Sequence, residues 1–168
     1  MSDQCRRTPP WLFHLLEKQV VKQRFQLDAS ADKCNALCKK FYDEHQNGLK
    51  QRWYNPTYCN PPFADFGAWM LKARQEAYDR QLVACLVGPN GCSQSWFQEV
   101  AISGTIYAFD QRLVFFDSQT GKPTHGADRD SMCYVFGPNF WNALAKLGTF
   151  QMYQFHVKGM VVTTRTKT

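Results

Sequence analysis

Residues 57–64 read Thr-Tyr-Cys-Asn-Pro-Pro-Phe-Ala, and the rest of the chain is best understood in relation to this stretch. Pro61 and Pro62 fix two successive φ angles and remove two backbone donors, so the loop is predicted to be stiff. The Asn60 amide oxygen and a rigid carbonyl beside it form two acceptors, which suits an NH2 group with its two hydrogens. Phe63 offers a face on which a planar base can stack. An ordinary proline-rich turn is the other interpretation of these residues.

The length and charge of the chain limit its possible domain organisation and partners. Its 168 residues, 44% of them hydrophobic, predict one folded domain with a real core. Lys and Arg outnumber Asp and Glu by 20 to 14, and the net charge of +6 favours a polyanionic partner. We expect residues 1–7 to form a flexible basic lead-in, residues 8–150 a single domain, and residues 151–168 a C-terminal strand and tail.

The cysteines and the N-terminus indicate a cytoplasmic protein. The seven cysteines have no regular spacing, so we expect free thiols. Residues 1–10 contain no apolar signal core and no apolar run approaches the length of a membrane span, so no membrane association is expected. Cys34 and Cys38 have no second pair of ligands at metal-binding spacing, and we therefore predict no metal site.

Helix and strand signals alternate through the first hundred residues, and strand signals predominate afterwards. Thr8 is expected to cap the first helix and Asp65 to cap a later one, with Trp11 and Trp69 on the buried faces of these helices. Other helices are expected at residues 32–40, 93–100 and 138–147, and strands at residues 24–29, 81–87, 105–117 (with a turn near 110–111) and 131–136.

This order predicts a three-layer α/β fold with an antiparallel strand pair late in the chain. In such sheets, ligands bind beyond the carboxyl ends of the strands. Asp28, Asn60 and the loop that begins at Gly88 each follow a predicted strand, so we expect them to line one rim. A simple proline-rich turn would not predict this convergence.

Three stretches, taken in order, resemble amino-methyltransferases that use S-adenosyl-L-methionine. Residues 8–11, Thr-Pro-Pro-Trp, resemble an opening Thr-Pro motif, and residues 27–31, Leu-Asp-Ala-Ser-Ala, resemble a reduced form of the cofactor motif L-D-P-x-x-G-x-G. Residues 60–63, Asn-Pro-Pro-Phe, match the catalytic motif (D/N/S)-P-P-(Y/F). The chain is most similar to the compact phage-type DNA N6-adenine methyltransferase (Dam-like) family, over about residues 8–137. The resemblance implies a Rossmann-like methyltransferase sheet.

The sequence departs from the family pattern at three places. No G-x-G follows Asp28, although Ala29, Ser30 and Ala31 are small. Asn47 stands where the family usually has an acid before Gly-Leu, and Asp110-Gln111 replaces a glycine before Arg112. These departures bear on cofactor affinity more than on reaction type.

The resemblance implies roles for individual residues. Asn60, Pro61, Pro62 and Phe63 would be catalytic: the Asn60 amide oxygen and the Pro61 carbonyl accept the hydrogens of an adenine amine, which would attack the donor methyl in line, and Phe63 stacks on the extrahelical base. The cofactor S-adenosyl-L-methionine would be bound by Thr8, Pro9, Asp28, Ala29, Ser30, Asp43 and Asn60. Glu44 is an alternative to Asp43 for the ribose hydroxyls.

The implied partner is DNA, with RNA as an alternative. Phosphate contacts are expected from Lys72, Arg74, Arg112, Lys122 and Arg129. The chain is too short for a separate target-recognition domain, which predicts little sequence specificity. We expect a monomer or a small homo-oligomer, in the host cytoplasm if the protein is phage-encoded.

Two alternatives remain open on the sequence. The same motif would serve a methyltransferase acting on RNA adenine or on a protein glutamine, because both present a planar NH2 group. A non-catalytic nucleic-acid-binding protein on a degenerate methyltransferase scaffold would explain the missing G-x-G.

Overall fold

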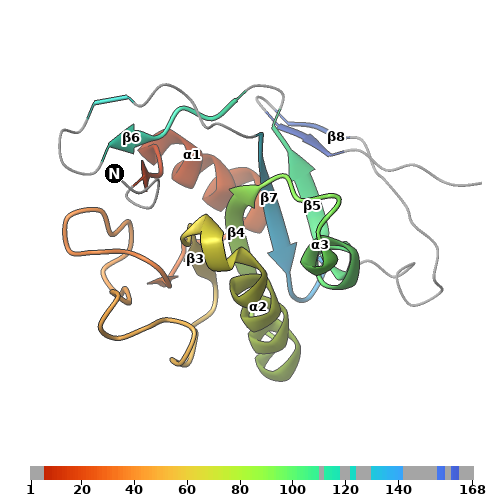
Figure 1. The fold of residues 1–168 in the computed structure, drawn as a ribbon, viewed down its shortest axis with the longest axis horizontal. Helices are drawn as coiled ribbons and strands as arrows, with labels where there is room; N and C mark the ends of the chain where they lie inside the picture. The colour runs from red at the N-terminus through yellow and green to blue at the C-terminus, as the bar shows by residue number, and fades with distance from the viewer. Residues whose placement is uncertain are drawn as a thin grey trace, which may run out of the picture.

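A mixed β-sheet forms the centre of the structure, a computed structural model that describes residues 6–109, 112–117, 122–123, 130–141, 155–157 and 160–162. Seven strands of these residues form the sheet in the order β2-β3-β4-β7-β5-β9-β8 (Figure 1). Their bounds are Leu27–Asp28 (β2), Thr57–Cys59 (β3), Ala84–Pro89 (β4), Ser131–Phe136 (β7), Thr105–Ala108 (β5), Met160–Val162 (β9) and Phe155–Val157 (β8).

The sheet has a parallel half and an antiparallel half. Strands β2, β3 and β4 run parallel, whereas each later neighbour in the order β4-β7-β5-β9-β8 is antiparallel. The longest pairing joins β4 to β7, from Ala84↔Phe136 to Pro89↔Ser131. The predicted α/β class is therefore confirmed, and the later strands of the sheet are antiparallel.

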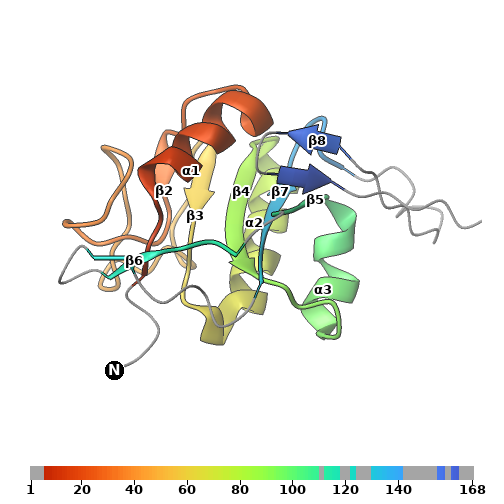
Figure 2. The ribbon, with the colours of Figure 1, turned by 90° about the horizontal axis from the view of Figure 1, so that it is seen from above.

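Helices cover both faces of this sheet (Figure 2). Helix α1, Pro10–Leu15, continues into the π-helical turns η1, Leu16–Val21, and packs on one face. Helices α2, Phe66–Arg80, and α3, Ser95–Glu99, pack on the other, where they are flanked by the short 3-10 turns η2, Phe63–Asp65, and η3, Ala101–Ser103. None of the helices in the described part of the chain has the length and apolarity to cross a membrane.

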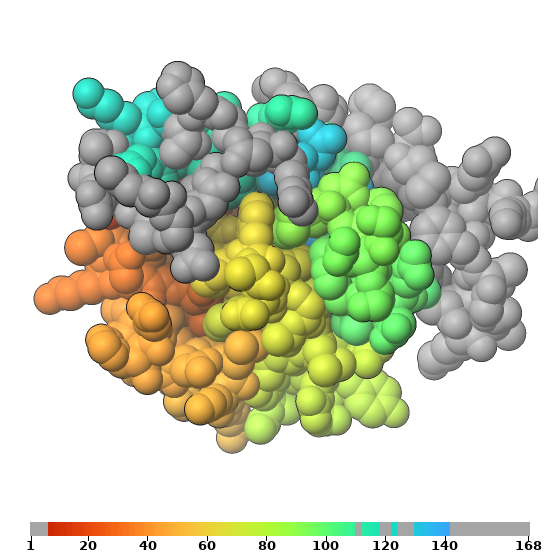
Figure 3. All heavy atoms as spheres, viewed as in Figure 1, coloured from red at the N-terminus to blue at the C-terminus, as the bar shows by residue number. Residues whose placement is uncertain are grey.

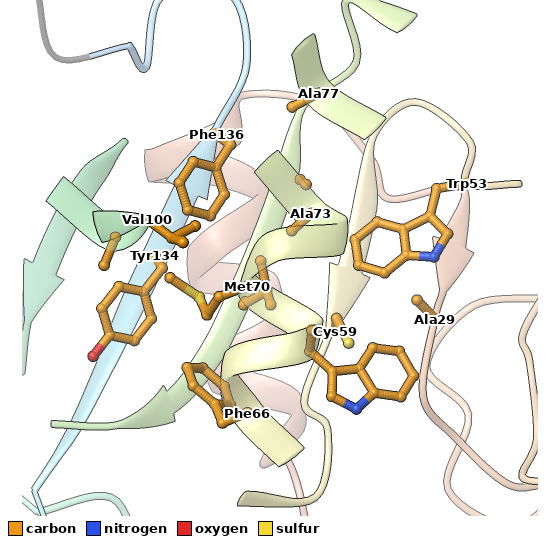
Figure 4. Packing of buried hydrophobic residues seen from close by; sticks show 14 of the residues in the cluster. Ala29, Trp53, Cys59, Phe66, Met70, Ala73, Ala77, Val100, Tyr134 and Phe136 are labelled. Atoms are coloured by element: carbon orange, nitrogen blue, oxygen red, sulfur yellow. The ribbon is translucent and has the colours of Figure 1, made fainter. Parts of the chain in front are cut away.

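Each face of the sheet has its own hydrophobic core. Under α2, Phe66, Met70 and Ala73 are fully or almost fully buried against the sheet, as the close-up shows (Figure 4). Trp53 lies near Ala29 at one end of this cluster. Because apolar burial is the main favourable term in folding, these two cores fix the strand ends from which the site is built.

Several predicted elements occur where the sequence indicates them. The strand predicted at residues 131–136 is β7, and the predicted buried strand at 81–87 is β4, which begins at Ala84 and extends to Pro89. Gly88 therefore lies inside β4 and not in a loop. A Cβ at Gly88 would come within 2.0 Å of the Phe66 ring, so only glycine allows this packing.

Other predictions about local structure are wrong. Residues 32–40 form turns and bends instead of a helix, because the Asp32 carboxylate accepts hydrogen bonds from the backbone N–H groups of Cys34 and Asn35. Pro9, not Thr8, is the N-cap of α1, and the Thr8 side chain turns elsewhere. Trp11 is 57% exposed, whereas Trp69 is buried as predicted.

The strands expected at 105–117 do not pair with each other. Strand β5 pairs with β7 and β9, while β6, Phe116–Asp117, pairs with β1, Arg6–Arg7, in a separate two-stranded sheet. A strand period in one continuous segment cannot reveal that its two halves have different partners. The turn predicted near 110–111, residues 142–147 of the last predicted helix, residues 1–5 of the lead-in and residues 163–168 of the tail lie outside the described residues.

Candidate active site

The site is built at the carboxyl ends of β2 and β3. The parallel register pairs Leu27 with Thr57 and Asp28 with Tyr58, so the residues that follow each strand leave the sheet at the same edge. The Ala29 N–H donates to the Tyr58 carbonyl at 2.8 Å, which continues the ladder up to this edge. Asp28 and Asn60, far apart in sequence, thereby face one cavity.

This cavity has a volume of about 390 Å³, within the range of small-molecule sites. Six of the seven residues predicted to bind the cofactor line it, and so does Pro62, a second residue of the predicted catalytic motif beside Asn60: Thr8, Asp28, Ala29, Ser30, Asp43, Asn60 and Pro62. In the space-filling view, the segment between β2 and β3 (orange) lies beside the segment between β3 and α2 (yellow), and these two segments supply most of the lining (Figure 3). Pro9 has a different place, where its carbonyl accepts hydrogen bonds from the first turn of α1.

Thr8, near the N-terminus, holds the Asn60 side chain in one orientation. Its Nδ2–H donates to Thr8 Oγ1 at 3.0 Å, and Thr8 Oγ1 shares a hydrogen bond of 2.6 Å with the Tyr58 hydroxyl. Thr8 and Tyr58 are 7% and 1% exposed. The donor end of the Asn60 amide is therefore turned toward Thr8, and the acceptor end, Oδ1, lies on the opposite side of the amide.

The rest of the catalytic motif forms the turn into α2. Pro61 is buried, and Pro62 lines the cavity. Phe63 begins η2 and is half-buried, with its ring centroid 6.2 Å from that of Phe66 at an interplanar angle of 81°. This edge-to-face contact holds one side of the Phe63 ring against the core while part of the side chain stays accessible.

Asp28 is an ionisable group held in an apolar setting. It is 3% exposed, and burial raises the pKa of its carboxyl from 3.8 to about 7, although backbone N–H groups of Leu37 and Ser30 lower it. Its Oδ2 accepts a hydrogen bond from the Leu37 N–H at 3.1 Å, while Oδ1 is buried without a partner among the described residues. A buried oxygen without a donor costs folding free energy unless a ligand donates a hydrogen bond to it. Asp28 is therefore not an ordinary solvated acid.

The loop opposite Asp28 makes a close approach to the end of β2. A Cβ on Gly48 would lie 2.1 Å from the Ala29 carbonyl oxygen, so the loop backbone can pass there only with glycine. The Trp53 indole N–H donates to the Gly48 carbonyl at 2.8 Å and holds the loop in place. Gly48 therefore fixes how closely this loop packs against the end of β2.

Acidic residues of the same loop form the far wall of the cavity. Asp43 and Glu44 line it, and Asp43 Oδ1 also accepts the Gln46 N–H at 2.9 Å. A buried carboxylate with an unsatisfied oxygen, a second acidic wall and small residues between them fit a cationic nucleoside-containing ligand such as S-adenosyl-L-methionine.

The residues predicted to contact phosphate lie in different settings. Lys72 Nζ lies 2.6 Å from Glu76 Oε1, Arg74 donates to the Glu99 carbonyl, and Arg112 forms an exposed ion pair of 3.3 Å with Asp130. The Lys122 carbonyl accepts a hydrogen bond from the Asp117 N–H, and Arg129 lies outside the described residues. Their contacts with nucleic acid remain predictions.

Tyr58 and Arg7 are among the residues of the site that were not predicted from the sequence. Tyr58 lies two residues before Asn60 in a strand, and the two-residue period that places alternate side chains on one face is a signal that points to it. Arg7 lines the cavity beside Thr8, and no local pattern in the sequence distinguishes it from the other basic residues near the N-terminus.

Comparison with known proteins identifies the family of the chain. The family model for DNA N-6-adenine-methyltransferase (Dam) matches residues 2–161. The chain is 28% identical over 159 residues to the DNA N-6-adenine-methyltransferase of Haemophilus phage HP1, covering 92% of this chain and 90% of the phage protein. It is 29% identical over 147 residues to the protein of the same name from Escherichia phage T1, covering 76% of this chain and 60% of that protein. The chain therefore belongs to the DNA N-6-adenine-methyltransferase (Dam) family.

Proposed function

We propose that this protein transfers a methyl group from S-adenosyl-L-methionine to the N6 amine of adenine in DNA. The observation that carries the proposal is the oriented Asn60 amide beside the cavity that also contains the buried Asp28 carboxylate. We also propose that the sheet is of the Rossmann-like methyltransferase type. Its parallel half β2-β3-β4, with the cavity at the carboxyl ends of β2 and β3, supports that assignment.

Different residues around the cavity would bind different parts of the cofactor. Asp28, with its buried acceptor, would bind the ammonium group, and Asp43 or Glu44 would accept the ribose hydroxyls. The aromatic side chains Tyr42 and Trp69 line the same cavity. When bound, the cofactor supplies a methyl group activated by its positively charged sulfur.

Asn60 and Pro61 would act on the substrate amine. The exocyclic amine of adenine is a weak nucleophile because its lone pair is delocalised into the ring. Acceptance of its two N–H bonds by Asn60 Oδ1 and the Pro61 carbonyl would favour the pyramidal form of the nitrogen and direct the lone pair toward the cavity. Phe63 would stack on the base after it has left the helix.

The substrate is proposed to be DNA with little sequence specificity. The net charge of +6 favours a polyanion. Base contacts would then come mainly from the catalytic loop itself, which holds one adenine at a time.

Product analysis tests the proposal. The purified chain is incubated with labelled S-adenosyl-L-methionine and unmethylated duplex DNA, single-stranded DNA, RNA or a glutamine-containing protein, and the DNA and RNA products are digested to nucleosides. We expect the label in N6-methyldeoxyadenosine. Label only in RNA or protein would move the activity to those acceptors, and the absence of both cofactor binding and transfer would favour a non-catalytic binding protein.

A further inference from the structure

Three side chains from two distant parts of the chain form one continuous hydrogen-bonded series. Tyr58 belongs to β3, Asn60 follows that strand, and Thr8 precedes α1, some fifty positions earlier in the sequence. The Tyr58 hydroxyl and Thr8 Oγ1 are 2.6 Å apart, and Asn60 Nδ2 donates to the same Thr8 oxygen at 3.0 Å. Thr8 is therefore the link between a buried phenol and the amide proposed to hold the substrate.

The far end of this series is rigid. The Tyr58 ring is packed edge-on against Phe13, with centroids 5.1 Å apart, and is tilted against Phe25 at 5.5 Å. A fully buried ring in contact with two other rings has little rotational freedom. Burial raises the pKa of the Tyr58 hydroxyl well above its usual value, so it remains a neutral group that can donate or accept.

Thr8 is also held from both sides. It directly follows β1, whose Arg7 pairs with Phe116 of β6, and it precedes Pro9, whose carbonyl accepts hydrogen bonds from Leu12 and Phe13. The backbone on each side of Thr8 is thus tied to a different element, which fixes the position of its hydroxyl relative to β3.

We propose that Tyr58 and Thr8 are positioning residues that orient the Asn60 amide for catalysis, an inference that rests on the proposed function. An asparagine side chain can rotate about its last bond, and half of those orientations would present Nδ2, a donor, to a substrate amine that is itself a donor. In this structure Thr8 Oγ1 accepts from Nδ2, which places Nδ2 toward Thr8 and Oδ1 at the other end of the amide. Thr8 would then serve Asn60 and not only the cofactor.

The first arm of the test measures turnover. Tyr58→Phe and Thr8→Val remove one hydroxyl each and keep the shape of the side chain, while Thr8→Ser keeps the hydroxyl. With saturating cofactor and DNA, we expect kcat to fall by about tenfold in Tyr58→Phe and by at least that factor in Thr8→Val. Thr8→Ser should recover most of the activity. The double variant should be no slower than Thr8→Val, because both changes break one series.

The second arm does not depend on activity. The side-chain amide signals of Asn60, identified by their loss in Asn60→Ala, are followed by NMR in the full chain. We expect these signals to shift and to exchange faster with water in Thr8→Val and Tyr58→Phe. Tyr134→Phe is the matched control, because Tyr134 is a buried tyrosine whose hydroxyl donates to the Pro89 carbonyl at 2.7 Å, away from Asn60. It should leave both kcat and the Asn60 signals unchanged.

The two arms separate the possible failures. Wild-type kcat in Tyr58→Phe and Thr8→Val, or a Thr8→Ser variant as slow as Thr8→Val, would overturn the positioning role. A change in cofactor Kd without a change in kcat would assign Thr8 to the cofactor and equally overturn it. If the wild-type protein transfers no methyl group, the proposed function fails, and unchanged Asn60 signals in the variants would reject the orientation of the amide independently.

Discussion

Asp28 is a buried ionisable residue. Its setting suits a carboxylate that binds a cofactor better than one that only supports the fold. It is 3% exposed, and burial raises the pKa of its carboxyl to about 7. Burial therefore leaves the charged form of Asp28 poorly stabilised by the protein alone, and a cationic ligand would stabilise it. The raised pKa of Asp28 predicts how cofactor binding and the stability of the fold depend on pH.

The affinity for S-adenosyl-L-methionine should rise with pH around neutrality. Below a pKa of about 7, Asp28 is mostly protonated and cannot pair with the ammonium group, so the Kd should be about tenfold larger at pH 6 than at pH 8. Calorimetric titration across this range measures the effect. Asp28→Asn should bind weakly with little pH dependence, whereas Asp43→Asn should keep the wild-type trend; a flat wild-type profile would contradict the role of Asp28.

The stability of the ligand-free protein should change in the opposite direction. A carboxyl whose pKa is raised on folding stabilises the fold fully below its unfolded value of 3.8, and that stabilisation is lost as the pH rises through about 7. At pH 8 the loss is of the order of 4 kcal/mol at most. Asp28→Asn should therefore unfold at a clearly higher temperature than the wild type at pH 8 and at nearly the same temperature at pH 4. Equal differences at both pH values would refute this account.

Gly48 is the second residue with a sharply defined requirement. Its Cβ position lies 2.1 Å from the backbone oxygen of Ala29, so Gly48→Ala must displace the loop from the end of β2. We expect a loss of about 2 kcal/mol in the free energy of unfolding and a weaker affinity for the cofactor. Gly67→Ala, inside α2 and 3.2 Å from Trp96, is the matched control and should change either quantity much less. Denaturant unfolding and calorimetry measure both.

At the scale of elements, α2 connects the site to the loop before β3. Glu76 is buried on α2, where its carboxylate accepts a hydrogen bond from the backbone N–H of Trp53 at 3.2 Å and pairs with both Lys72 and Arg80. Trp53 in turn holds the Gly48 loop, so the ion pairs on α2 support the acidic wall of the cavity through one intermediate residue. Lys72, predicted from the sequence to contact phosphate, therefore has a structural partner.

The variant Lys72→Ala distinguishes the structural role of Lys72 from its predicted contact with phosphate. Because Lys72 forms the shorter of the two ion pairs of Glu76 and is only 19% exposed, its loss should lower the free energy of unfolding by about 1 kcal/mol. The affinity for DNA should change little. Thermal unfolding and DNA titration at two salt concentrations measure the two effects, with Gln75→Ala, at an exposed position of the same helix, as the control. Unchanged stability with a marked loss of DNA affinity would instead support the phosphate contact.

At the scale of the whole molecule, the sequence predicts those features of the fold and the site that depend on local sequence pattern. The continuous apolar run of β4 and the segment of β7 are readable as buried strands, and Asp28 and Asn60 are readable as residues at strand ends. The partners of the strands are not readable: β6 pairs with β1 and not with β5. Thr8 illustrates the same limit, because a threonine before two prolines predicts a helix cap, while its hydroxyl in fact binds Tyr58 and Asn60 across the fold.

The central claim is that the Asn60 amide acts on the substrate amine and not on the fold or the cofactor pocket as a whole. The most direct test compares Asn60→Ala with the wild type in methyl transfer to DNA, in calorimetric binding of S-adenosyl-L-methionine and in thermal unfolding. Gln75→Ala, which removes an amide from the exposed side of α2, is the control and should behave as the wild type. We predict that Asn60→Ala reduces transfer by at least about a thousandfold while cofactor binding and folding persist. An active Asn60→Ala enzyme would contradict the account.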